Sequence, residues 1–381
     1  MSPKLRKLLP IIISSFIGTT GLAFSTVMPV LLGGIVDQLD FARSMVGWIA
    51  SSNIMGIATG GLIATLLIGR VPLISMVSLG LVGLMLFDGI SAWVEQPLTM
   101  LGVRGLSGVF GGLVYASTMA TFSGLKDPLK AFSTYVVVYC LWSFVALLLM
   151  PYLLASFGLK AGFHLLVSIS FVSLLGSSMI KRLETSVKEK SFLSLNVLLS
   201  NKWILLSLLA YFAMHTAGGT IWAYLERIAK DAGLAQEFTG TALGMSRLVS
   251  LFGALLIIRM GNKAGVIVPI LFTLEGMAVG MILLFYAAIP FIYVVAICLF
   301  GGAWSIAIPY FQKIQSQFDA QGKVVSLGTI VNMGGRSVGP AMAAMIVGSS
   351  AFSNVIWLGL GAILCSVLLL IPVLLSNKKL P

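Results

Sequence analysis

The stretch LGVRGLSGVFGGLVY, residues Leu101–Tyr115, carries an arginine inside a run that is otherwise apolar. A charge at that depth in lipid is costly, so Arg104 should face a protein interior or an aqueous cavity and is a candidate functional residue. Gly108, Gly112 and Tyr115 follow Arg104 at i+4, i+8 and i+11, on the same stripe of a helix. The two glycines form a GxxxG pattern, which allows a neighbouring helix to approach closely. The stretch therefore predicts a membrane-spanning helix packed tightly around a polar centre.

The composition is that of an integral membrane protein. Hydrophobic residues make up 58% of the chain and charged residues 9%, and the mean hydropathy is +1.05. A spanning helix needs ~20 apolar residues, so a chain of this length with short loops has room for about a dozen. The net charge of +12 does not indicate a nucleic-acid partner, because the basic residues lie in short segments between apolar runs. The three cysteines lie inside apolar runs and predict neither disulfides nor a metal site.

Twelve apolar segments can be counted along the chain. They lie approximately at residues 10–35, 45–68, 72–94, 98–123, 130–156, 163–180, 203–225, 238–258, 266–288, 290–312, 325–348 and 353–373. Because the number is even, both termini lie on one side. Seventeen basic residues fall in the segments on the side of the termini and four in the opposite loops, which predicts cytoplasmic termini in a plasma membrane or bacterial inner membrane.

The two halves of the chain look like repeats. GLIATLLIGR at residues 61–70 is matched by GALLIIRMGN at residues 253–262, and FGG at residues 110–112 is matched by FGG at residues 300–302. The two offsets are nearly equal and lie on either side of a basic loop. We therefore expect a six-helix half over residues 1–180, a cytoplasmic basic linker over 181–202 and a second six-helix half over 203–381.

These features resemble the major facilitator superfamily. The loop after the second span of that family reads G-x-L-A-D-R-x-G-R, and this chain has Gly61, Ala64, Gly69 and Arg70, with Thr65 in place of the acidic residue. The resemblance implies an all-α integral membrane fold of twelve transmembrane helices in two six-helix pseudo-repeats. It also implies a cavity lined by spans one, four, seven and ten and flanked by spans two, five, eight and eleven.

The fourth span resembles the family more closely. Leu101, Arg104 and Gly108 match the pattern L-x-x-R-x-x-x-G, which is associated with proton-coupled members. A Gly-Pro pair, Gly339 and Pro340, lies in span eleven, the fifth span of the second half. The resemblance thus places Arg104 on a helix that lines the cavity.

Polar and aromatic residues recur at helical spacing in several spans and form the candidate site. The candidates for substrate binding or proton coupling are Arg104, His215, Glu226, Arg247, Glu275, Asn332 and Arg336. The candidate cavity aromatics are Tyr115, Tyr139, Trp142, Tyr211, Trp222 and Trp304. The candidates for helix packing or gating are Gly61, Gly69, Arg70, Gly108, Gly112 and Pro340.

Each candidate also has a structural interpretation. The three arginines in the spans could satisfy carbonyl groups beside glycines, and His215 could hydrogen-bond a neighbouring helix. Glu226 lies at an outer helix end, where a solvated carboxylate is ordinary, and the aromatic stripes could be helix packing. Glu275 lies in mid-membrane and must be protonated or paired, and we expect Arg247 or Arg336 as its partner.

The balance of charges within the spans predicts the class of substrate. Three arginines and a histidine stand against two acids, Asp88 and Glu275, so a residual positive cavity should attract an anion. A formal G-x-S-x-G match at Gly335–Gly339 lies inside an apolar helical run and lacks the strand-turn-helix context of a nucleophile, so no enzyme is predicted. Neither a P-loop nor a metal motif is present, and we expect no cofactor.

The sequence thus predicts a monomeric secondary transporter that moves a small organic anion across the lipid bilayer, coupled to protons. Two alternatives remain open. One is a drug or sugar exporter of low selectivity, and the other is a transport-inactive membrane scaffold or receptor.

Overall fold

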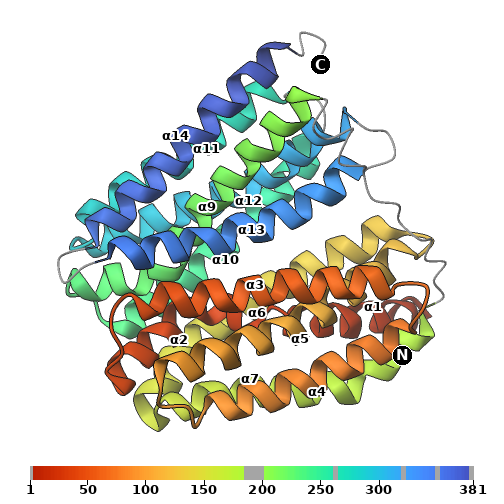
Figure 1. Ribbon diagram of the computed structural model, residues 1–381. Coiled ribbons are helices and arrows are strands. Elements are labelled where there is room, and N and C mark those ends of the chain that lie inside the picture. Colours follow the sequence, from red (N-terminus) through yellow and green to blue (C-terminus); the bar gives the residue numbers. More distant parts are fainter. Residues whose placement is uncertain (1–2, 184–200, 261–264, 319–322, 348–351, 377–381) are drawn as a thin grey trace. The chain divides into compact units, whose positions relative to one another are not determined.

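The computed structural model describes residues 3–183, 201–260, 265–318, 323–347 and 352–376, and all regular elements in these ranges are helices (Figure 1). The chain forms two compact units, Met1–Lys190 and Ser191–Pro381. Most of the predicted linker, residues 184–200, lies outside the described ranges.

The first unit contains seven α-helices and a short 3-10 helix. They are α1 (Pro3–Thr20), α2 (Ala23–Leu39), α3 (Met45–Leu67), α4 (Leu73–Ser91), α5 (Pro97–Ser123), α6 (Pro128–Phe157), α7 (Leu159–Gly176) and η1 (Ser177–Arg182). The first predicted span is broken, because α1 and α2 meet at an angle of 41° at Gly21 and Leu22. The other five predicted spans of this half each correspond to one long helix.

The second unit contains six α-helices and a second 3-10 helix. They are α9 (Lys202–Asp231), α10 (Gln236–Met260), α11 (Ile267–Leu283), η2 (Leu284–Tyr286), α12 (Pro290–Ser316), α13 (Lys323–Ile346) and α14 (Ser353–Ser376). Each of the last six predicted segments has its helix here, in the predicted order.

The helices have the length and composition of membrane spans. In the described part of the chain, nine helices are long and apolar enough to cross a bilayer, and the bent pair α1–α2 supplies a tenth candidate. The two remaining long helices, α10 and α13, fall on predicted segments and carry Arg247 and Arg336. The prediction of an all-α membrane protein is confirmed.

Local sequence signals set several helix starts and turns. Proline occupies the first turn of α5, α6 and α12, where its missing N–H group is not needed. Asn201 caps α9, because its side-chain oxygen accepts from the backbone N–H groups of Trp203 and Ile204 at 3.0 and 3.4 Å. After α3, Gly69 has φ +87°, a conformation that L side chains rarely adopt.

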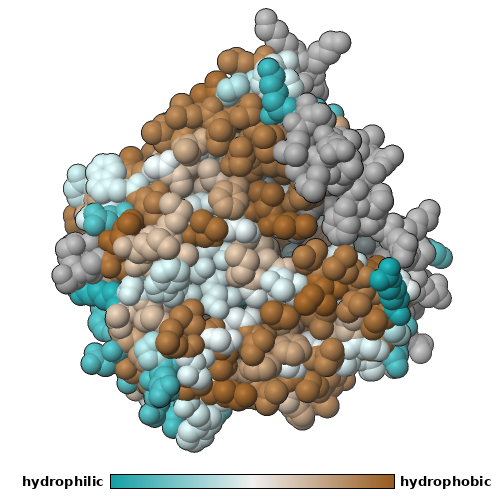
Figure 2. Space-filling view, in the orientation of Figure 1, coloured by the Kyte–Doolittle hydropathy of each residue, from teal (hydrophilic) through white to brown (hydrophobic). Residues whose placement is uncertain are grey.

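Large apolar side chains cover the outer faces of the helices. Figure 2 shows hydrophobic residues over α14, where Leu364 and Leu368 are 59% and 60% exposed. Such faces suit lipid and are not expected on a water-soluble protein of this size.

Close helix packing in the first unit depends on glycines of α5, which lies between α3 and α4 (Figure 1). A Cβ atom on Gly112 would lie 2.8 Å from the backbone nitrogen of Gly61, and one on Gly108 would lie 3.0 Å from the carbonyl carbon of Asn53. On the facing helix, a Cβ on Gly60 would lie 2.7 Å from the carbonyl carbon of Val109. The backbones of α3 and α5 are therefore in direct contact along the predicted GxxxG stripe.

The same helix also receives the break of the first span. A Cβ on Gly21 would lie 2.9 Å from the backbone nitrogen of Tyr115, and one on Gly111 would lie 3.4 Å from the carbonyl carbon of Gly21. The helix break thus packs directly against the backbone of α5.

The second unit uses a different helix pair for its closest packing. Gly335 and Gly339 on α13 face α9, where added Cβ atoms would lie 3.1 Å from the nitrogen of Thr216 and 2.9 Å from that of Thr220. Gly219 on α9 faces α13, where a Cβ would lie 2.8 Å from the Cα of Arg336. Spans seven and eleven are thus held in backbone contact.

We expect Gly112→Ala to destabilise the protein by about 1–3 kcal/mol, because the added methyl group overpacks a backbone contact. Gly102→Ala on the same helix is the matched control, since nothing lies within 4 Å of a Cβ there, and it should leave stability unchanged or raise it by up to about 1 kcal/mol. Unfolding of both variants in mixed micelles measures the difference. Equal effects would contradict the close approach of α3 and α5.

Candidate functional site

Arg104 is fully buried and forms an ion pair inside the first unit. Its Nη1 lies 2.6 Å from Oδ1 of Asp88 on α4 and donates a weaker hydrogen bond, of 3.3 Å, to Oγ of Ser91. Ser107, on the same face of α5 as Arg104, donates to the same carboxylate oxygen at 2.8 Å. The charge of Arg104 is therefore balanced by the neighbouring helix.

The guanidinium group also lies against two aromatic rings. Its Cζ is 3.7 Å from the ring centroid of Phe24 on α2 and 5.8 Å from that of Phe163 on α7. Asn53 on α3 donates from Nδ2 to the carbonyl oxygen of Arg104 at 3.0 Å. Arg104 thus connects α2, α3, α4 and α7 to α5, which indicates a role in holding the unit together.

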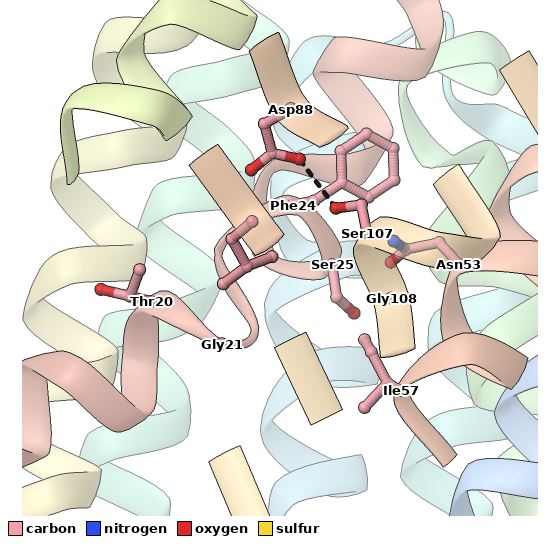
Figure 3. A pocket seen from close by; sticks show the side chains of 10 residues that line it. Thr20, Gly21, Phe24, Ser25, Asn53, Ile57, Asp88, Ser107 and Gly108 are labelled. Atoms are coloured by element: carbon pink, nitrogen blue, oxygen red, sulfur yellow. Dashed lines mark hydrogen bonds between the residues drawn. The ribbon is translucent and has the colours of Figure 1, made fainter. Parts of the chain in front are cut away.

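A small pocket adjoins this ion pair at the break of the first span (Figure 3). It is lined by Thr20, Gly21, Phe24, Ser25, Asn53, Ile57, Leu84, Asp88, Ser107 and Gly108. The volume open to the centre of a water molecule is about 10 Å³, which is room for one water at most and far too little for an organic solute. Asn53 Oδ1 and Arg104 Nη2 have no protein partner among the described residues, so a single water suits this place.

In the second unit, His215 lies at the centre of a polar and aromatic cluster. Trp304 on α12 donates from its indole Nε1 to Nδ1 of His215 at 3.2 Å. On the other side of the ring, Nε2 lies 2.9 Å from the Asn332 amide of α13, and that amide is 3.3 Å from the hydroxyl of Tyr211. Three helices therefore contribute to one buried network.

The aromatic rings of the cluster pack edge to face and tilted. The ring centroids of Tyr211 and His215 are 4.5 Å apart, and those of Tyr211 and Phe311 are 5.0 Å apart. Gly218 makes room for the indole of Trp304, because a Cβ there would lie 2.6 Å from the indole ring. A glycine at this position of α9 is thus needed to accommodate the neighbouring tryptophan.

Arg247 lies over the ring of a second indole. Its Cζ is 3.7 Å from the ring centroid of Trp222 on α9. Among the described residues, the structure records no hydrogen bond or ion pair for this guanidinium group, and its Nε is buried without a partner. Arg336 lies close to the His215 cluster, with its Cζ 5.5 Å from the ring centroid of Trp304.

The two acidic candidates of this unit lie apart from that cluster. Glu226, which the sequence places at an outer helix end, is only 1% exposed and accepts two hydrogen bonds from Arg227, at 2.5 and 2.8 Å. Glu275 is exposed on the outer face of α11, and no partner is recorded for it within the described ranges. The expected pairing of Glu275 with Arg247 or Arg336 is therefore not seen.

The remaining candidates lie mainly in the first unit. The ring of Tyr135 lies 6.1 Å from that of Tyr115 and 6.0 Å from that of Tyr139, and the ring of Trp142 meets Phe16 edge to face at 6.0 Å. Gly61 and the exposed Arg70 lie near the end of α3 and in the loop that follows it. Pro340 is buried within α13 of the second unit.

Sequence reasoning missed the partner of Arg104. The sequence identifies Asp88 only as one of two acids within the spans, and Ser107 and Asn53 are not among the candidate residues. A usable signal was present: Arg104 and Ser107 share one face of α5, and only a short loop separates that helix from α4. Two consecutive antiparallel helices bring such groups together.

Comparison with known proteins identifies the fold. The sequence profile of the Major Facilitator Superfamily matches residues 13–340. A crystal structure of a point mutant of the nucleoside transporter NupG has a TM-score of 0.76 at 13% identity, with 97% of this chain and 99% of that chain covered. The D-xylose-proton symporter also has a TM-score of 0.76 at 13% identity, with 98% of each chain covered.

A third similar structure is a bacterial homologue of the human lysosomal transporter Spinster, in an inward-facing and unoccupied conformation. Its TM-score is 0.69 at 12% identity, with 98% of this chain and 96% of that chain covered. None of the curated protein sequences matches significantly. At these identities the likeness is one of fold.

We expect Asp88→Ala to destabilise the first unit by about 3–5 kcal/mol, because it leaves the buried charge of Arg104 uncompensated. The double variant Asp88→Leu with Arg104→Met should recover much of that loss, since no buried charge remains. Unfolding in mixed micelles of the wild type, Asp88→Leu, Arg104→Met and the double variant gives the coupling free energy. Additive effects of the two changes would contradict the ion pair.

Proposed function

Because the chain belongs to the Major Facilitator Superfamily, we propose that it is a secondary active transporter of a small organic solute. Transport proceeds by alternating access, in which a site near the membrane midplane opens to one side and then to the other. The protein acts as a monomer in a plasma membrane or bacterial inner membrane, with both termini in the cytoplasm. We expect no enzymatic activity.

The observation that carries the choice of an anion is the stacking of Arg247 on Trp222. The Cζ of the guanidinium group lies 3.7 Å from the centroid of the indole ring, and its Nε has no hydrogen-bond partner among the described residues. Arginine in this arrangement suits bidentate binding of a carboxylate or phosphate group. Within the described ranges no acidic side chain neutralises Arg247, so an anionic solute would do so.

Arg104 is the less suitable binding residue. Its charge is already balanced by Asp88 at 2.6 Å, and the pocket beside it has room for one water at most. We therefore assign substrate binding to Arg247, His215, Asn332 and Arg336 of the second unit. Arg104 acts through the packing of the first unit.

We propose protons as the coupling ion. His215, Glu226 and Glu275 are the titrating candidates, because each lies within a membrane-spanning helix and can change its charge. One similar structure is that of a D-xylose-proton symporter, which makes the proton the first ion to test.

A weakly selective drug or sugar exporter is the second candidate function. The cluster of Tyr211, His215, Trp304 and Phe311 favours it, because aromatic rings bind many apolar or planar solutes without strict geometry. A transport-inactive scaffold or receptor would require no solute site, and flux measurements separate it from both transporters.

We expect Arg247→Met to lower the transport rate of organic anions in reconstituted vesicles by about tenfold or more, because a charge-assisted hydrogen bond is lost. Candidate solutes come from a thermal-shift screen of the purified protein, since a ligand that binds the folded state raises its stability. Lys126→Gln, which removes an exposed loop charge, is the control and should transport normally. Transport restricted to cations or neutral sugars would contradict the anion proposal.

A pH gradient across the same vesicles should drive accumulation of the transported anion, and collapse of the gradient with a protonophore should abolish that accumulation. His215→Gln, Glu226→Gln and Glu275→Gln then identify the coupling residue as the variant that still equilibrates the solute but no longer concentrates it. Accumulation that ignores the pH gradient in the wild type would exclude proton coupling.

A further inference from the structure

The hydrogen bond between Trp304 and His215 fixes the protonation pattern of the histidine. The indole Nε1–H group can only donate, and it lies 3.2 Å from Nδ1 of His215. Nδ1 must therefore be the acceptor and carries no hydrogen. A neutral imidazole in this position has its single hydrogen on Nε2.

The tautomer of His215 in turn determines the orientation of the side-chain amide of Asn332. The Nε2–H group needs an acceptor at the amide atom 2.9 Å away, and the only acceptor of the amide is its oxygen. The two ends of an amide are nearly identical in shape, so a half-turn of the group places the oxygen there. The same oxygen also accepts from the hydroxyl of Tyr211, at 3.3 Å. The chain Trp304, His215, Asn332 is then satisfied at every step.

After this half-turn, the NH₂ group of Asn332 occupies the position at which the structure records Oδ1. The atom recorded there is buried and has no hydrogen-bond partner among the described residues. Two N–H donors in a buried place require an acceptor. Arg336 lies one helical turn further along α13, so a positive charge is close to this position.

We infer that the NH₂ group of Asn332 donates to a carboxylate oxygen of the transported solute. Trp304 and His215 are positioning residues, because they hold the amide in the orientation that presents its donors and not its oxygen. This inference rests on the proposed transport of an organic anion and adds the group that recognises it. A carboxylate supplies a charged acceptor oxygen to this NH₂ group, whereas an alcohol in its place supplies only a neutral and weaker acceptor.

The protonation pattern can be measured without any solute. The chain has two histidines, and His164 is exposed on α7 in the other unit, so His164→Gln leaves His215 as the single reporter. Solid-state NMR of this variant, labelled with [15N]histidine in bilayers, should show a protonated Nε2 and an unprotonated Nδ1. A protonated Nδ1 would overturn the inference.

Binding of defined carboxylates tests the donor itself. The probes are acetate, succinate and benzoate, with ethanol, butanediol and benzyl alcohol as uncharged counterparts, and calorimetry gives the dissociation constants. For each carboxylate that the wild type binds, Asn332→Asp should weaken binding by about tenfold or more, because an acceptor replaces the donor. Trp304→Phe should weaken it several-fold with the ring retained, since the histidine and the amide are no longer held in one orientation.

The outcomes separate the inference from the proposed function. Carboxylate binding that is unchanged in a folded Asn332→Asp variant would overturn the inference but not the proposed function. The partner of the Asn332 NH₂ group would then be a water molecule. Binding of none of the three carboxylates, together with binding of their alcohols, would overturn the anion proposal as well. Thermal unfolding of each variant verifies that weaker binding is not loss of the fold.

Discussion

The buried ion pair between Arg104 and Asp88 is the interaction on which the first unit depends. A guanidinium group in the membrane interior must be neutralised by a neighbouring group, because it is shielded from bulk water. Its partner on α4, the ring of Phe24 on α2 and the amide of Asn53 on α3 all meet at this one side chain. The glycines of α5 allow these helices to approach closely enough for their side chains to contact Arg104. The neutralisation of Arg104 therefore depends on the close packing of the helices.

The arginines within the spans of the two units have different surroundings. The first unit balances its buried arginine internally and leaves room for one water at most beside it. The second unit holds Arg247 on an indole and centres its polar network on a neutral histidine. The closest backbone contacts also differ, since they join spans two and four in one unit and spans seven and eleven in the other. If the second unit binds the solute as proposed, the first unit contributes mainly close packing and the second unit contributes the recognition of the solute.

The fold could be predicted from the sequence because hydrophobic segments indicate the spans directly. The GxxxG pattern predicted that a neighbouring helix approaches α5 closely, and the structure identifies that helix as α3. The partners of the polar residues could not be predicted equally well. Tyr211 and His215 are four residues apart and therefore share one face of a helix. The contribution of Trp304 and Asn332 depends on how α12 and α13 are rotated about their axes. The same uncertainty of rotation gave Glu275 an expected partner, whereas its side chain is exposed on α11. Helical periodicity shows which residues share a face of one helix, but the residues that this face contacts depend on how the helices pack.

The break between α1 and α2 has a mechanical consequence. An unbroken helix behaves as a stiff rod, so a force on one end displaces the other. A helix interrupted at Gly21 and Leu22 lacks the continuous backbone hydrogen bonding that makes a long helix stiff. The break is in backbone contact with α5 at Gly111, which fixes its position along that helix. The first span is therefore anchored at its break, and this break lies beside the ion pair of Arg104 and Asp88.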